Sequence, residues 1–192
     1  PLVLFLHGAK GAGASQKIVR CLVSPGLESV SPLVIAPASD KGEWWTNEDA
    51  AYVLGVVAAA KRDWPVRADH VVVTGYSNGG IGAWAYARLY PDTFSAAIPI
   101  AGNDTIIGET PVPVFAIHGS LDEQFPLEPI QQNIDKLKKA GFDVTLTVRN
   151  RAKHMDPCKY EDELEMAAEW LEKSAWTKPK KVAPSATAPS KP

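Results

Sequence analysis

The stretch that decides the fold is Val71-Val-Val-Thr-Gly-Tyr-Ser-Asn-Gly-Gly80. Its first part belongs to an apolar run over residues 70–74 that predicts a buried strand, and a helical pattern follows over residues 78–90. Between them, Ser77 has a glycine two residues before it and another two residues after it. This spacing is typical of a sharp strand-to-helix turn that exposes a serine hydroxyl, so we expect Ser77 to be a nucleophile. The competing interpretation is a glycine-rich turn whose serine caps a helix.

Short apolar runs and segments of helical length alternate along the whole chain. Strands are expected at residues 2–6, 33–36, 70–74, 96–100, 112–117 and 144–148, and helices at residues 15–23, 48–62, 78–90, 127–140 and 159–173. Because the apolar runs show little polar alternation, both faces of the sheet should be covered, as in a parallel sheet. The pattern predicts an α/β fold with a doubly wound, mostly parallel sheet of about six strands and helices on both faces.

The length of 192 residues argues for one domain, which we place at residues 1–176. Residues 177–192 are rich in Pro, Ala, Ser and Lys and contain no aromatic residue, which favours a disordered tail or linker. Pro1 opens directly on an apolar run, as though the chain began inside a longer precursor. A signal segment therefore cannot be assessed, and the compartment stays open between cytoplasmic and secreted.

The charge pattern limits the classes of partner. The net charge of −2 comes from 20 basic and 22 acidic side chains spread along the chain, which argues against a nucleic-acid-binding surface. No apolar stretch approaches the roughly 18 residues needed to span a bilayer. We expect a small-molecule substrate, no nucleic acid and no membrane span, while the oligomeric state is not indicated.

A serine hydroxyl becomes a good nucleophile only when a neighbouring base takes its proton. The chain has four histidines. His154 follows the last expected strand and precedes the last helix, which is where this topology delivers a base to the strand ends. His7 lies before the serine turn. His70 begins the strand over residues 70–74, at the end of that strand opposite to Ser77, and His118 directly follows the strand over residues 112–117. We therefore predict that His154 is the base for Ser77.

The acid that orients the base should follow the strand over residues 112–117. Asp122 lies in the loop directly after that strand, so it is the predicted acid. Its neighbour Glu123 is the first alternative, and Asp104 is a weaker one. Asp156 is disfavoured because it lies too close to the base in sequence.

Acyl transfer also requires amides that bind the developing oxyanion. One should be the amide of Asn78, directly after the nucleophile. The second is expected from the glycine-rich loop over residues 7–13, with Ala9 preferred and Lys10 in reserve. A phosphate-binding loop is disfavoured because the Gly-Lys-Ser/Thr ending is absent.

Four apolar residues are candidates for contact with a substrate. Trp44 and Trp45 follow the strand over residues 33–36, on the edge where the site should lie, although core packing is an equal alternative for at least one of them. Phe125 and Met155 flank the proposed acid and base. No long insertion supplies a lid, so an open site for a small or soluble substrate is expected. Scattered histidines and the absence of Cys-x-x-Cys predict no metal and no cofactor.

The two cysteines, Cys21 and Cys158, can form at most one disulfide. Their separation in the sequence does not indicate whether they meet in space. The favoured interpretation is two independent buried or half-buried thiols, because free cysteine packs readily as a small apolar residue.

Several motifs together resemble one superfamily. They are Leu4-Phe-Leu-His-Gly8, Val73-Thr-Gly-Tyr-Ser-Asn-Gly-Gly80, Ile117-His-Gly-Ser-Leu-Asp122 and the late His154. Over about residues 2–173 the chain resembles the α/β-hydrolase superfamily, in particular its phospholipase/carboxylesterase and feruloyl or polyhydroxybutyrate esterase-like branches. In two respects it departs from them. Lys153 stands where a glycine usually precedes the base, and two strands that commonly precede the first one are missing, which leaves six strands in place of eight.

The resemblance implies a triad of Ser77, Asp122 and His154, with Ala9 and Asn78 as oxyanion donors. It also implies hydrolysis of carboxylic esters through an acyl-enzyme. A peptidase, a thioesterase or an acyltransferase on the same scaffold is the alternative. A non-catalytic binding module is a further alternative, against which the complete triad argues.

Overall fold

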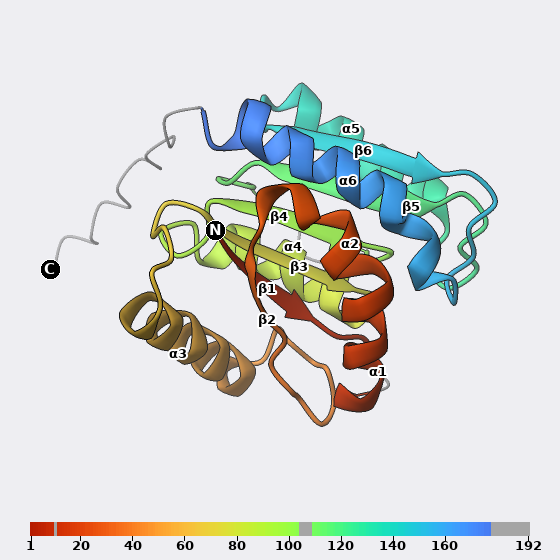
Figure 1. Ribbon diagram of the computed structural model, residues 1–192. Coiled ribbons are helices and arrows are strands. Elements are labelled where there is room, and N and C mark those ends of the chain that lie inside the picture. Colours follow the sequence, from red (N-terminus) through yellow and green to blue (C-terminus); the bar gives the residue numbers. More distant parts are fainter. Residues whose placement is uncertain (10, 104–108, 178–192) are drawn as a thin grey trace, which may run out of the picture.

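The computed structural model describes residues 1–9, 11–103 and 109–177, and these form one layered α/β structure (Figure 1). Its sheet has six strands in the order β2-β1-β3-β4-β5-β6, and all pairs are parallel. The strands are β1 (Leu2–Leu6), β2 (Leu33–Ile35), β3 (Val71–Tyr76), β4 (Ala96–Ile100), β5 (Val114–Gly119) and β6 (Val144–Arg149). The predicted fold class and the six strands are thus confirmed.

The strand order reverses direction between β1 and β3. β1 pairs with β3 from Leu2 opposite Val71 to Leu6 opposite Gly75, so these two strands end side by side. The chain leaves β1 toward β2 on one side and leaves β3 toward β4 on the other. Ligands of open α/β sheets bind at such a switch point, outside the carboxyl ends of the strands. Both His7 and Ser77 follow the strands that form it.

The helices cover both faces of the sheet, as Figure 1 shows. They are α1 (Ala12–Ile18), α2 (Ser24–Gly26), α3 (Asn47–Asp63), α4 (Asn78–Leu89), α5 (Leu127–Lys139) and α6 (Glu161–Trp170). Alternate strand residues face opposite sides. Leu4 of β1 joins the core with α3, α4 and α5, whereas Phe5 joins the core with α1, the residues that directly follow α1, and α6.

Local signals explain several helix ends. The side chain of Thr46 accepts a hydrogen bond from the amide of Asp49 at 3.1 Å and so caps α3. Gly141, expected to follow the helix over residues 127–140, has φ of +85°, the left-handed conformation that ends a helix without strain. Two expected helices, over residues 15–23 and 159–173, are interrupted: π turns follow α1 at Val19–Val23 and α6 at Leu171–Ala175. The short helix α2 was not expected.

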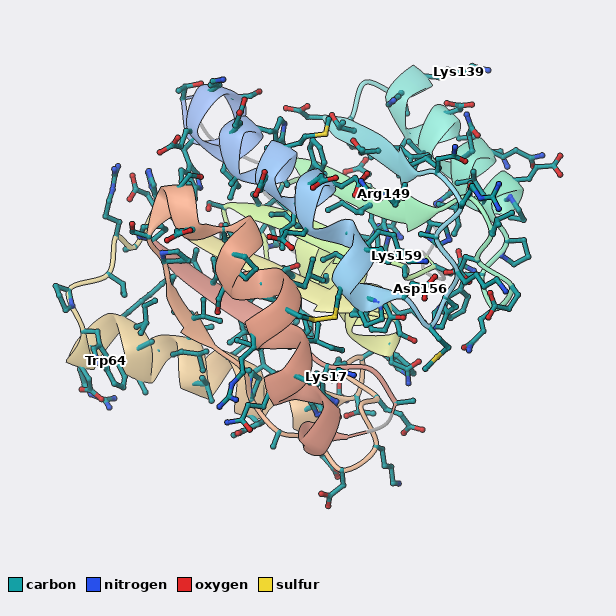
Figure 2. The ribbon with its side chains drawn as sticks, turned by 45° about the vertical axis from the view of Figure 1, so that its right-hand side comes forward. Lys17, Trp64, Lys139, Arg149, Asp156 and Lys159 are labelled. Atoms are coloured by element: carbon teal, nitrogen blue, oxygen red, sulfur yellow. A yellow bond between two sulfur atoms is a disulfide. The ribbon has the colours of Figure 1, made fainter. Side chains whose placement is uncertain are left out.

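The expectation of two independent thiols is wrong, because Cys21 and Cys158 form a disulfide. Cys21 lies in the π turn after α1, and Cys158 lies in the 3₁₀ turn Pro157–Tyr160 before α6. Both segments pack on the same face of the sheet, which brings the two Cα atoms to 5.4 Å. Figure 2 shows the bridge as a yellow bond close to the labelled Asp156 and Lys159.

The last described residues pack at the far edge of the sheet, where β3 and β4 begin, opposite the end at which Ser77 lies. The indole of Trp176 stacks on the imidazole of His70 with ring centroids 4.3 Å apart, and its N–H donates to Ser95 Oγ at 3.2 Å. The expected tail over residues 177–192 lies outside the described residues except for Thr177. Within the described part of the chain, no helix combines the length and apolar character needed to cross a bilayer.

Candidate active site

Ser77 occupies a strained turn between β3 and α4. Its φ of 59° and ψ of −120° lie in a region that L-residues rarely adopt. The turn is held in place because the Ser77 amide donates to the carbonyl of Ile100 at 3.0 Å and the Ser77 carbonyl accepts from the amide of Ile81 at 3.0 Å. This geometry directs the hydroxyl out of the sheet edge, as the glycine spacing predicts.

Glycines permit the close packing of this turn. A Cβ added at Gly79 would lie 1.8 Å from the carbonyl oxygen of Leu6, and one added at Gly75 would lie 2.3 Å from the oxygen of Gly79. Gly8, from the loop after β1, passes so close that a Cβ there would lie 3.2 Å from Ser77 Cβ. The loop after β1 therefore borders the serine directly.

Ser77, His154 and Asp122 form a continuous hydrogen-bonded chain. Ser77 Oγ lies 2.9 Å from His154 Nε2, and His154 Nδ1 lies 2.8 Å from Asp122 Oδ2. Because a carboxylate only accepts, Nδ1 carries the proton and Nε2 is left to accept from the serine hydroxyl. His154 and Asp122 are almost fully buried, and Ser77 keeps a small exposed area. This arrangement can remove the hydroxyl proton and stabilise the imidazolium that results.

The carboxylate of Asp122 is fixed by its own loop. Its Oδ1 accepts the amides of Gln124 at 3.0 Å and Phe125 at 2.8 Å, so Oδ2 is left for His154. The loop that holds the base is joined to this loop, because the Leu121 amide donates to the carbonyl of Ala152 at 3.0 Å.

The alternative acids have other partners. Glu123 Oε2 accepts the backbone amide of His154 at 3.2 Å rather than a ring nitrogen. Asp156 Oδ2 binds the amide of Lys153 at 3.2 Å and the ammonium of Lys159 at 2.9 Å, and these contacts lower the pKa of Asp156. Asp104, like the reserve oxyanion donor Lys10, lies outside the described residues.

The other three histidines have different surroundings. His7 donates from Nδ1 to the carbonyl of Gly8 at 2.7 Å and accepts the Ser39 amide at Nε2 at 3.0 Å, which orders the loop after β1. His70 lies at the far edge of the sheet. His118 is buried beside the acid, with Nε2 2.8 Å from the carbonyl oxygen of Phe125 and 3.5 Å from Asp122 Oδ2.

Two aromatic rings hold the imidazole of His154. Tyr76 stacks on it with centroids 5.6 Å apart, and Phe125 meets it edge-on at 5.3 Å. Burial raises the pKa of the Tyr76 hydroxyl, so that side chain stays neutral. The imidazole of His154 is therefore flanked by uncharged rings. Its position depends on the loop that carries His154 and on the loop that carries Asp122 and Phe125.

The predicted oxyanion donors lie on both sides of Ser77. Asn78 is the first residue of α4, and the first amides of a helix have no partner within the helix. Ala9 directly follows Gly8, the residue in close approach to the serine. The exposed Ala9 belongs to the loop that His7 orders from its buried position.

The predicted substrate contacts divide into two groups. Trp44 is fully buried in the core, where its indole N–H donates to the carbonyl of His7 at 2.7 Å, so it does not line an open site. Trp45 and Met155 are substantially exposed, and Phe125 is half-buried. Leu121, next to the acid, is equally exposed, and the sequence analysis missed it because a lone leucine in a loop carries no pattern.

Among the described residues, no group of three or more His, Cys, Asp or Glu side chains is placed to hold a metal ion.

The parallel sheet and the serine turn at its switch point define an α/β-hydrolase fold. The model of the dienelactone hydrolase family matches residues 41–183, and the chain belongs to this family. The chain is similar to a solved structure of a fluorophosphonate-binding serine hydrolase from Staphylococcus aureus: the match covers 89% of this chain and 84% of that protein, with a TM-score of 0.71 and 17% identity. That likeness is one of fold.

Two curated relatives are similar to part of the chain. An uncharacterized secreted protein of Arthroderma benhamiae is 28% identical over 129 residues, which cover 58% of this chain. A protein of Nocardia uniformis subsp. tsuyamanensis that carries the name of an esterase, NocK, is 27% identical over 146 residues, or 67% of this chain. The matches span 13% and 41% of the two relatives' own lengths.

Proposed function

We propose that this chain hydrolyses carboxylic esters through an acyl-enzyme formed on Ser77. The observation that carries the proposal is the continuous hydrogen-bonded chain from Ser77 Oγ through His154 to Asp122. Membership of a hydrolase family and the position at the switch point of the sheet support it.

In the first half-reaction, Ser77 Oγ attacks the ester carbonyl carbon while His154 Nε2 takes the hydroxyl proton. Asp122 remains ionised and stabilises the imidazolium. The oxyanion is bound by the amides of Asn78 and Ala9, and each such donor is worth roughly 3 kcal/mol in the transition state. Collapse of the intermediate breaks the ester C–O bond, and the leaving alkoxide takes the proton from His154.

In the second half-reaction, water replaces the alcohol. His154 takes a proton from the water as it attacks the acyl carbon, and then returns that proton to Ser77 Oγ. The acid product leaves, and the serine is restored. In each half-reaction, His154 therefore acts first as a base and then as an acid.

Substrate contacts are proposed at exposed apolar side chains beside the triad. Met155 follows His154, and Leu121 precedes Asp122 on the facing loop. Gln124 Nε2 lies 4.0 Å from Met155 Sδ, which places the thioether over the acid loop. Two further contacts are proposed at the half-buried Phe125, whose ring meets the imidazole of His154, and at the exposed Trp45 in the loop after β2. Because these side chains are uncharged, we propose that small neutral esters are preferred.

The test of the reaction is a fluorophosphonate probe combined with short-chain nitrophenyl esters. Wild type is expected to be labelled and to release nitrophenol, and Ser77→Ala is expected to lose labelling and at least about 10⁴-fold in kcat. Absence of both labelling and turnover in folded wild type would contradict ester hydrolysis. Consumption only in the presence of an amine or alcohol acceptor would indicate an acyltransferase.

The test of the substrate contacts compares matched exposed residues. Met155 and Met166 are 51% and 52% exposed, and Leu121 and Leu89 are 51% and 56% exposed, but Met166 and Leu89 lie on helices away from the triad. Met155→Ser and Leu121→Ser should each raise KM for longer-chain esters by about 3- to 10-fold, since a lost apolar contact costs roughly 1 kcal/mol. Met166→Ser and Leu89→Ser should leave KM unchanged. Equal effects in all four variants would refute the contact.

A further inference from the structure

His118 is a buried titratable side chain beside the triad for which the proposed reaction has no step. It belongs to β5 and is 1% exposed. Its Nε2 faces the carbonyl oxygen of Phe125 at 2.8 Å. Since a carbonyl only accepts, Nε2 must carry the proton and donate it.

This hydrogen bond closes the loop that holds the acid. It joins the end of β5 to Phe125, seven residues further along the chain. The amide of Phe125 donates to Asp122 Oδ1 at 2.8 Å, and its ring meets the imidazole of His154 edge-on. One residue held by His118 thus contacts both the acid and the base.

A neutral imidazole suits this place better than a cation would. Burial lowers the pKa of His118, so the side chain stays uncharged near neutral pH. Its Nε2 lies 3.5 Å from Asp122 Oδ2, the oxygen that accepts from His154. A permanently charged side chain there would attract this carboxylate and compete with the imidazolium.

We propose that His118 is a positioning residue: it holds Phe125, and through Phe125 the carboxylate of Asp122, in line with His154. This inference rests on the proposed esterase reaction. His118, the histidine of the Ile-His-Gly-Ser-Leu-Asp segment, thus has a positioning role in that reaction, in addition to the triad of Ser77, His154 and Asp122.

The test uses two amides of different length. Glutamine can place its amide nitrogen where histidine has Nε2, and asparagine can place it only near Nδ1. His118→Gln should therefore keep kcat within about 3-fold of wild type, and His118→Asn should lower kcat by about 10- to 100-fold with KM unchanged, as expected for a misplaced catalytic group. Both rates are divided by the number of sites that a fluorophosphonate titrates, so unfolded protein does not count.

The pH profile separates positioning from folding. The charged and titratable groups that face His154 are Asp122 and Glu123 from the acid loop, Tyr76 from β3 and His118 from β5. If Asp122 moves away in His118→Asn, the imidazolium loses a partner, so the acid limb of kcat/KM shifts to lower pH.

The matched control is His70→Asn, which removes a buried histidine at the far edge of the sheet. It should lower stability and leave kcat per titrated site and the acid limb unchanged. Equal kcat in His118→Gln and His118→Asn, with an unshifted acid limb, would overturn the positioning role. Wild type without turnover would instead contradict the esterase proposal, and Ser77→Ala in the same assay identifies that case.

Discussion

Glu123 and Asp122 are neighbours in the chain, yet they bind different atoms of His154. Asp122 accepts from the ring, and Glu123 accepts from the backbone amide at 3.2 Å. Glu123→Ala should lower kcat by roughly 3- to 10-fold, the effect of losing a hydrogen bond worth about 1 kcal/mol that fixes the base loop. Glu123→Gln keeps an accepting oxygen and should retain the rate, as should Glu128→Ala on α5. Steady-state kinetics checks this, and equal losses in both Glu123 variants would show that the charge matters instead.

Trp44 illustrates how a buried indole serves a site without lining it. Its N–H donates to the carbonyl of His7, which orders the loop beside Ser77. Trp44→Phe should cost about 1–3 kcal/mol of unfolding free energy, because the buried carbonyl loses its donor. The exposed Trp45→Ala should stay within about 0.5 kcal/mol of wild type. Urea unfolding of both variants tests this, and a large loss for Trp45 with none for Trp44 would reverse the assignment.

The turn from β3 to α4 depends on the absence of a side chain at Gly79. A Cβ there would lie 1.8 Å from the carbonyl oxygen of Leu6, and neither strand nor helix can move without breaking the sheet. Gly79→Ala should therefore cost more than about 4 kcal/mol or prevent folding. In contrast, Gly55→Ala in α3 meets nothing within 4 Å and should stabilise the protein by about 0.5–1 kcal/mol. Chemical denaturation compares them, and equal stabilities would refute the close approach.

Sequence reasoning worked for these elements where the signal was local. Apolar runs and the glycine spacing around Ser77 predict the strands and the turn, because both depend on neighbours in the chain. The disulfide between Cys21 and Cys158 could not be predicted, since it depends on two helical segments meeting on one face of the sheet. Which tryptophan is buried was equally hidden, because Trp44 and Trp45 are adjacent and identical.

At the scale of the whole molecule, that disulfide joins two segments that lie far apart in the sequence, near the two ends of the described chain. The chain between Cys21 and Cys158 includes Ser77, Asp122 and His154, and the bridged positions are 137 residues apart in sequence. It also connects the π turn after α1 with the 3₁₀ turn that follows His154 in the chain.

Closing so long a loop restricts the unfolded chain, so the double variant Cys21→Ser/Cys158→Ser should lose about 2–5 kcal/mol of unfolding free energy. Urea unfolding with and without a dithiol reductant measures the effect. Reductant should lower the wild-type midpoint to that of the double variant and leave the variant unchanged. Because reducing compartments open such bridges, the protein should be more stable under oxidising conditions. Thiol counting verifies that reduction is complete. If the urea midpoint of fully reduced wild type does not change, packing of α1 and α6 alone holds the two segments together.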